Sequence, residues 1–142
     1  MNHKVSRALI VENDVYMRKL IRIAVEMCGI KKVVEVDNGS LFFRRTNLER
    51  QESGAIAQNT SDIVFLDWLM PDFDGMACAR RIRSGAVNGL DADVPIIMLT
   101  GNAGAEGRQL AADAGVNVFL TKPINVQEMS AAIRQVTSSG TG

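Results

Sequence analysis

The sequence has no surplus of charge, few cysteines and no long apolar run. Its 16 basic and 16 acidic residues cancel, so the chain lacks the basic excess that is typical of nucleic-acid-binding proteins. No apolar stretch approaches the length of a membrane span, and residues 1–7 do not lead into the apolar segment of a signal peptide. These absences predict a cytoplasmic protein that binds neither nucleic acid nor a membrane.

Cysteine and histidine are too scarce to suggest chemistry of their own. Cys28 and Cys78 are far apart in the sequence, have no CxxC spacing, and each lies in an apolar periodic stretch. We therefore expect both cysteines to pack in the core. His3 is the single histidine and has no acid or thiol close to it in the sequence, so we assign it no role.

Hydrophobic residues make up 46% of the 142 residues, which is enough for one sizeable core. Four apolar runs, at 8–11, 63–66, 96–99 and 116–120, are continuous, and a weaker fifth run lies at 33–36. Continuous runs are typical of strands that are covered on both faces. Helical spacing between the runs predicts βαβ units, and therefore an α/β fold with an open, doubly wound parallel sheet and helices on both faces.

Two helices are clear in the sequence. The first has an apolar face and ends where Gly29 supplies a stop. That face consists of Leu20, Ile21, Ala24, Val25 and Cys28. In the last helix, Asn125 and Glu128 match a capping box, and apolar residues recur at helical spacing from Val126 to Val136.

We expect one domain over residues 5–137, a flexible tail at 138–142 and no output domain. The polar segment Arg50–Ser61 is interpreted as a lengthened connection between the second helix and the third strand, and residues 85–93 as another loop.

Polar residues follow the predicted strands at their carboxyl ends, where ligands bind in an open parallel sheet. Glu12–Asp14 follow the first strand, Asp67 the third, Thr100 the fourth and Lys122 the fifth. Clustered carboxylates need a cation, and a site of oxygen ligands with room for a phosphate favours Mg²⁺. An aspartate in such a site is able to act as a nucleophile and form an aspartyl-phosphate. Asp67 is our candidate nucleophile, with Lys122 and Thr100 contacting the phosphoryl oxygens.

The segment Asp67–Gly75 resembles the D-x-x-M-P-x-x-D-G motif of the receiver domains of two-component response regulators. Ala8–Asp14 is similar to the first strand of that family with its acidic pair, Thr100 to its switch hydroxyl, and Lys122–Pro123 to its lysine–proline pair, which is usually joined by a cis peptide. The resemblance runs from about Val5 to Val136. It implies a flavodoxin-like, five-stranded parallel sheet with the strand order 2-1-3-4-5.

The resemblance implies that Asp67 takes a phosphoryl group from a histidine kinase or a histidine phosphotransfer protein, and that this switches protein–protein binding in a phosphorelay. Lys122 would bind the phosphoryl oxygens. Thr100 and Phe119 would form the switch, which is steric because Phe119 replaces the tyrosine of many relatives. Such a domain catalyses only its own phosphorylation and dephosphorylation, so it is not a turnover enzyme. The target would bind the face of the fourth helix, fifth strand and fifth helix, and homodimerisation on phosphorylation is left open.

The implied metal is Mg²⁺, with ligands from Glu12, Asn13, Asp67 and the main-chain carbonyl of Leu69. Asn13 replaces the second acid of the family's acidic pair, and its amide oxygen carries no charge. Asp14 either supplies the missing carboxylate or caps the first helix, and the sequence does not separate these two roles.

Two other functions are weighed against this one. A degenerate receiver would keep the fold and its protein contacts without phosphorylation, because Asn13 weakens the metal site. An aspartate-nucleophile phosphatase shares the general architecture, but usually has a D-x-D pair after the first strand, where this chain has Glu12–Asp14. A flavin-binding protein would need a phosphate loop rich in Ser, Thr and Gly at the same place, and the carboxylates there argue against it.

Overall fold

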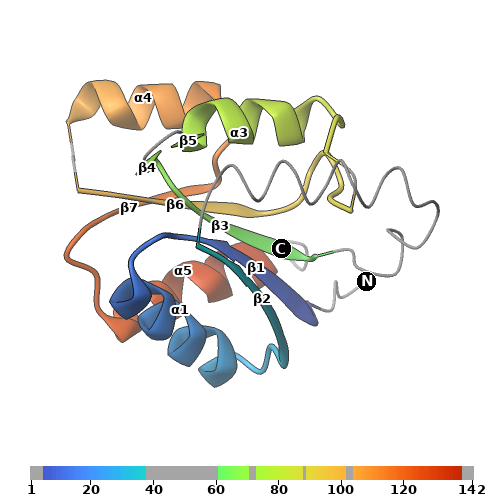
Figure 1. Ribbon diagram of the computed structural model, residues 1–142, viewed down its shortest axis with the longest axis vertical. Helices are drawn as coiled ribbons and strands as arrows, with labels where there is room; N and C mark the ends of the chain where they lie inside the picture. Colours follow the sequence, from blue (N-terminus) through green and yellow to red (C-terminus); the bar gives the residue numbers. More distant parts are fainter. Residues whose placement is uncertain (1–4, 38–60, 71–72, 88, 102–103, 139–142) are drawn as a thin grey trace.

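A computed structural model describes residues 5–37, 61–70, 73–87, 89–101 and 104–138. Strands and helices are interspersed along these ranges (Figure 1). The strands are β1 (Arg7–Val11), β2 (Lys32–Val36), β3 (Ile63–Asp67), β4 (Leu69–Met70), β5 (Phe73–Asp74), β6 (Ile96–Thr100) and β7 (Val118–Thr121). The helices are α1 (Val15–Met27), α3 (Gly75–Arg83), α4 (Ala105–Asp113) and α5 (Val126–Ser138). None of these helices is long and apolar enough to cross a membrane.

Within the described ranges, five strands form one parallel sheet in the order β2-β1-β3-β6-β7. Numbered along the sequence as strands of this sheet, the order is 2-1-3-4-5, so the predicted α/β fold class and strand order are confirmed. Val11 of β1 pairs with Leu66 of β3, and Thr100 of β6 pairs with Thr121 of β7. The carboxyl ends of these four strands therefore lie at one edge of the sheet. The residues that follow the strands meet at this edge.

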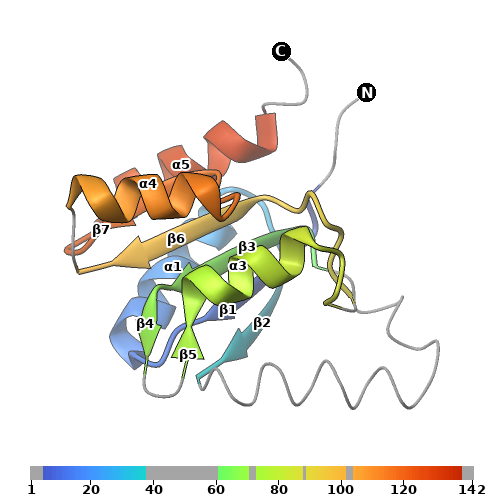
Figure 2. The same ribbon diagram turned by 90° about the horizontal axis from the view of Figure 1, so that it is seen from above.

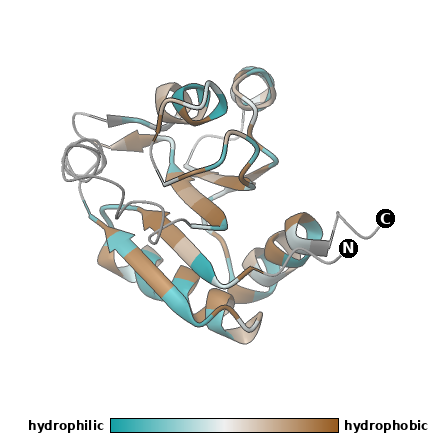
Figure 3. Cartoon of the chain, turned by 90° about the vertical axis from the view of Figure 1, so that its right-hand side faces the viewer, coloured by the Kyte–Doolittle hydropathy of each residue, from teal (hydrophilic) through white to brown (hydrophobic). Residues whose placement is uncertain are grey.

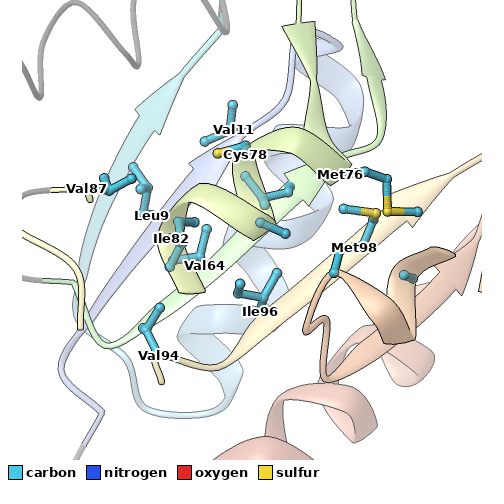
Figure 4. Close-up of a cluster of buried hydrophobic side chains, with 14 of the residues drawn as sticks. Leu9, Val11, Val64, Met76, Cys78, Ile82, Val87, Val94, Ile96 and Met98 are labelled. Atoms are coloured by element: carbon cyan, nitrogen blue, oxygen red, sulfur yellow. The ribbon is translucent and has the colours of Figure 1, made fainter. Parts of the chain in front are cut away.

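Helices cover both faces of the sheet: α1 and α5 lie on one face, and α3 and α4 on the other (Figure 1, Figure 2). Hydrophobic residues concentrate in the strands, and the helices carry hydrophobic and hydrophilic residues together (Figure 3). Figure 4 shows the core under α3, where Leu9, Val64 and Ile96 of the sheet pack with Cys78 and Ile82 of the helix. A second core joins α1 and α5 to the opposite face of the same strands.

The two cysteines differ in burial. Cys78 is fully buried, as predicted. Cys28 is only half-buried at the rim of the second core, where its Sγ lies 3.8 Å from the carbonyl oxygen of Ser130 on α5. The expected core position is therefore confirmed for Cys78 and only in part for Cys28.

The two helices that were clear in the sequence are confirmed together with their ends. The Asp14 carboxylate accepts a hydrogen bond from the N–H of Tyr16 at 2.9 Å and so caps α1, which ends before Gly29 in the left-handed region (φ 86°). At α5, the N–H of Glu128 donates to Asn125 Oδ1 at 2.7 Å, and the N–H of Asn125 donates to Glu128 Oε1 at 3.3 Å. This is the predicted capping box.

Two local features differ from the prediction or were missed. β7 begins at Val118 rather than at residue 116, because the side-chain oxygen of Asn117 turns towards the sheet and accepts a hydrogen bond from the N–H of Ile96 at 2.8 Å. The antiparallel hairpin of β4 and β5 was not predicted. Strands of two residues are too short to show any hydrophobic period.

The predicted connections are described only in part. Residues 85–93, apart from residue 88, form a loop between α3 and β6, as expected. Ser138 is the last residue of α5 rather than the start of a tail. Residues 139–142, residues 50–60 of the long connection, and Pro71–Asp72 of the motif lie outside the described residues.

Candidate functional site

Glu12, Asp67 and Lys122 come together at the carboxyl edge of the sheet, because Glu12 follows β1, Asp67 ends β3 and Lys122 follows β7. The Lys122 Nζ lies 3.3 Å from Glu12 Oε1 and 3.5 Å from Asp67 Oδ2. Glu12 is fully buried and Asp67 is 5% exposed. Buried charges require partners, and here two carboxylates share one ammonium group.

Contacts to the main chain hold Glu12 in this position. Its N–H donates to the carbonyl of Val36 at 3.0 Å, and its own carbonyl accepts a hydrogen bond from Arg18 Nη1 at 2.9 Å. Glu12 Oε2 accepts from the N–H of Asp14 at 3.1 Å. Arg18 also pairs with Glu35 of β2 at 3.2 Å, so α1, β2 and the loop after β1 fix Glu12 jointly.

The Glu12 carboxyl holds its proton unusually tightly. Burial and the nearby charge of Asp67 raise the pKa of Glu12 to about 7, although the N–H of Asp14 and the ammonium of Lys122 lower it. Glu12 Oε1 accepts no hydrogen bond from the described residues. Once Glu12 is ionised, the two carboxylates outnumber the one ammonium group, and such a set of oxygen donors suits an additional hard cation.

The other residues predicted to bind metal lie nearer the surface. Asn13 is exposed, and so is Asp14, whose carboxylate caps α1. Leu69 in β4, whose main-chain carbonyl is the predicted ligand, is 68% exposed. The described part of the chain has no group of three or more His, Cys, Asp or Glu side chains that could hold a metal ion. Glu12 and Asp67 are thus the two predicted acidic ligands that the structure brings together.

After Asp67 the chain folds back tightly through β4 and β5 into α3. The N–H of Gly75 donates to the carbonyl of Trp68 at 2.6 Å, and a Cβ at residue 75 would overlap the carbonyl oxygen of Asp67. Glycine is therefore required at the end of the predicted motif. Asp74 begins α3 by accepting a hydrogen bond from the N–H of Met76 at 2.9 Å.

Thr100 and Lys122 are neighbours where β6 and β7 end. Thr100 is buried, and its carbonyl accepts a hydrogen bond from the N–H of Lys122 at 2.6 Å. The Lys122–Pro123 peptide bond is cis, as the resemblance implies. Gly101 is exposed, and no described atom lies within 4 Å of the place that its Cβ would take. The chain is therefore open to solvent immediately after Thr100.

Phe119, the predicted switch residue, is half-buried on β7 and contacts Trp68. The two ring centroids are 6.3 Å apart and the ring planes meet at 63°, an edge-to-face arrangement. The guanidinium carbon of Arg108 lies 5.6 Å from the centroid of the Phe119 ring. No sequence pattern indicates this group, because its members belong to separate elements that only the tertiary structure brings together.

The response regulator receiver domain family matches residues 8–134 of the chain. The probable transcriptional regulator ycf27 of Guillardia theta is 32% identical over 130 residues, which cover 92% of this chain and 44% of that protein. The phosphate regulon transcriptional regulatory protein PhoB of Pseudomonas aeruginosa is 29% identical over 128 residues, which cover 90% of this chain and 50% of that protein. The chain spans about half the length of these curated relatives.

Solved structures share the fold. A CheY-like response regulator receiver domain protein from Methanospirillum hungatei has a TM-score of 0.73 at 19% identity, covering 97% of this chain and 98% of that one. A response regulator receiver domain protein from Clostridium thermocellum has a TM-score of 0.73 at 22% identity, covering 96% and 98%. The family match spans the sheet and both helical layers, and receiver domains are the phosphoacceptor domains of two-component systems. The chain belongs to the response regulator receiver domain family.

Proposed function

We propose that Asp67 accepts a phosphoryl group from a histidine kinase or a histidine phosphotransfer protein, and that the modification switches the binding of a protein partner. The observation that carries this proposal is the buried arrangement of Asp67, Glu12 and Lys122 at the carboxyl edge of the sheet. A carboxylate beside an ammonium group is a nucleophile whose product, an acyl phosphate, is stabilised by the same ammonium. Membership of the receiver family supports the assignment.

In the proposed reaction, a carboxylate oxygen of Asp67 attacks phosphorus, and the bond from phosphorus to the imidazole nitrogen of the donor breaks. The imidazole leaves with the bonding electron pair. Lys122 would pass from its ion pair with Asp67 to the phosphoryl oxygens, since its Nζ already lies 3.5 Å from Oδ2. Thr100, at the end of the adjacent strand, would donate its hydroxyl to the same oxygens. Attack of water on phosphorus would later release phosphate and restore the carboxylate.

The carboxyl oxygens of Glu12 and Asp67, which outnumber the ammonium of Lys122 in charge once both are ionised, support Mg²⁺ as the cofactor. Asp67 and Glu12 would hold it with carboxylate oxygens, and the Leu69 carbonyl and the Asn13 amide with neutral oxygens. When bound, the ion supplies positive charge that offsets the charge of the phosphoryl group. We assign the remaining place to Asn13 rather than Asp14, because the Asp14 carboxylate already caps α1.

The proposed output surface consists of α4, β7 and α5. Phe119 on β7 and the exposed Arg108 on α4 contact each other on this surface. A target protein bound there, or a second copy of the chain, would respond to a movement of the Phe119 ring.

Incubation with Mg²⁺ and acetyl phosphate tests the proposed phosphorylation. The intact mass of the protein should rise by one phosphoryl group, and the Asp67→Asn variant should keep its original mass. Fluorescence of Trp68, the neighbour of Asp67, should change when Mg²⁺ is added. An unchanged mass together with unchanged fluorescence would sink the proposal.

One observation favours a second candidate, a receiver that binds partners without phosphorylation. Asn13 is uncharged and exposed, and Asp14 is engaged as a helix cap. An Asn13→Asp variant separates the two functions. It should tighten Mg²⁺ binding and speed phosphorylation if the site is used, whereas a degenerate receiver would gain neither.

A further inference from the structure

Trp68, which directly follows the proposed phosphoacceptor, is held at both ends of its main chain. Its N–H donates to the carbonyl of Leu99 on β6 at 2.9 Å, and its carbonyl accepts a hydrogen bond from the N–H of Gly75 at 2.6 Å. The main chain that carries the indole is therefore tied to the sheet on one side and to the start of α3 on the other. Because Asp67 and Trp68 are adjacent in the chain, a displacement of Asp67 would act first on Trp68.

The indole packs against the main chain of α4. A Cβ at residue 107 would lie 2.9 Å from Cζ3 and 3.3 Å from Cη2 of Trp68, so the ring fits in this place only because residue 107 is glycine. Glycine is unfavourable inside a helix, yet Gly107 is a buried residue of α4. The packing of the indole against α4 accounts for the presence of glycine at residue 107.

The buried residues of α4 have small side chains or none. They are Gly107 and Ala111. In contrast, α3 has a side-chain cap and buries larger residues. In the N-terminal half of α4 the buried residue is thus Gly107, and the side chains nearest to it are Trp68 and Phe119.

Phe119 takes part in the same contact. A Cβ at residue 107 would lie 3.5 Å from Cζ of Phe119, whose ring is also edge-on to Trp68. The next residue of α4, Arg108, lies over the Phe119 ring. Gly107 therefore lies beside both rings, and Arg108 contacts the ring of Phe119.

We propose that Trp68 is a positioning residue, which couples the Asp67 site to α4 and Phe119 through its packing on Gly107. This inference rests on the proposed phosphorylation of Asp67 and adds the route by which that event reaches the output surface. When modification of Asp67 displaces the end of β3, the indole moves with it. Because Gly107 is in van der Waals contact with the indole, α4 moves too, and Phe119 changes its position between them.

Hydrogen exchange of the unmodified protein tests the contact itself. Trp68→Leu should speed the exchange of the α4 amides by about tenfold, because the helix loses its ring contact, while the α5 amides keep their wild-type rates. Trp68→Phe retains a ring and should restore most of the protection. Equal α4 exchange rates in Trp68→Leu and the wild type would overturn the proposal.

Treatment with acetyl phosphate and Mg²⁺ then tests the coupling. In Trp68→Leu and Gly107→Ala, the intact mass should show that Asp67 is modified to the wild-type extent. The NMR chemical-shift changes that this modification causes at the α4 amides should be about fivefold smaller than in the wild type. Leu110→Ala, at an exposed position of α4, should keep the wild-type response. Undiminished shifts in Trp68→Leu would overturn the coupling alone. An unmodified Asp67 in the wild-type protein would overturn the proposed function, and the coupling with it.

Discussion

Gly75 lies so close to Asp67 that a side chain at residue 75 would overlap the carbonyl oxygen of Asp67. The N–H of Gly75 also donates to the carbonyl of Trp68, which fixes the first residue of α3 against the end of β3. The intervening chain has to leave the strand and return to it through the short hairpin of β4 and β5. The last glycine of the motif is thus a steric requirement of the main chain that carries the proposed phosphoacceptor.

Gly75→Ala should lower the free energy of unfolding by about 2 kcal/mol or more, because the added methyl group forces α3 away from the strand end. Helix propensity acts in the opposite direction, since alanine is favoured over glycine by about 1 kcal/mol inside a helix. Urea denaturation followed by circular dichroism measures the net effect. In the matched control Gly101→Ala, no described atom lies within 4 Å of the new Cβ, and the stability should change by less than about 0.5 kcal/mol. Equal stabilities of the two variants would contradict the steric argument.

The candidate site was largely predictable because of one property of parallel sheets. Glu12, Asp67 and Lys122 are far apart in the sequence, but each lies at the carboxyl end of a strand, and those ends meet at one edge. The role of Asp14 was not predictable, because an aspartate at that place suits both a metal ligand and a helix cap. Only the direction of its side chain, towards the N–H of Tyr16, separates the two.

The contacts of α4 were beyond prediction from local patterns. The helices α1 and α5 have wide apolar faces, α1 is followed by Gly29 and α5 begins with a capping box, so their existence follows from the sequence. By contrast, α4 buries Gly107 and Ala111, which read as ordinary small residues. The closeness of Trp68 to Gly107 depends on how the helix lies over the sheet, and that is a tertiary property.

Arg83, the last residue of α3, links the segments that precede β6 and β7 through its guanidinium group. Its hydrogen bonds run from Nε to Gly115 O (2.9 Å), from Nη1 to Ala92 O (2.8 Å) and Val94 O (2.7 Å), and from Nη2 to Asn117 Oδ1 (2.9 Å). Arg83→Met keeps an aliphatic side chain but removes these hydrogen bonds, so the free energy of unfolding should fall by about 2 to 3 kcal/mol. Arg80→Met, at an exposed position of the same helix, should change it by less than about 0.5 kcal/mol. Thermal denaturation compares the two variants, and similar losses in both would argue against the network.

The two cysteines should differ sharply in reactivity. Cys78 is fully buried, and burial raises its pKa to about 12, so at pH 8 almost none of it is the reactive thiolate. Iodoacetamide should therefore modify the half-buried Cys28 of the native protein and leave Cys78 intact, whereas both should react in urea. Peptide mass spectrometry follows each site, and native Cys28→Ser should take up no label. Labelling of native Cys78 as fast as Cys28 would show that the core opens readily.

The buried carboxyl of Glu12 should make the stability of the metal-free protein depend on pH. Its pKa is raised from 4.5 to about 7 by burial and by the charge of Asp67. At pH values below the lower figure, the folded and unfolded chains are both protonated at Glu12, and the residue has no effect. Between the pKa of the unfolded chain and that of the folded chain, only the folded chain holds the proton, so the free energy of unfolding falls as the pH rises. Above the pKa of the folded chain the loss is complete.

Glu12→Gln has no titrating group at residue 12, so the difference in stability between the wild type and this variant reports the titration of Glu12 alone. In EDTA, the stability of the wild type relative to Glu12→Gln should decline by roughly 1 to 3 kcal/mol between about pH 5 and pH 8. Urea denaturation at each pH measures the decline, and Glu26→Gln, at an exposed position of α1, should show none. A constant difference would mean that folded Glu12 is already ionised at pH 5. Such a carboxylate would be buried away from water beside the charge of Asp67. The single ammonium group of Lys122 would then neutralise only one of the two carboxylates.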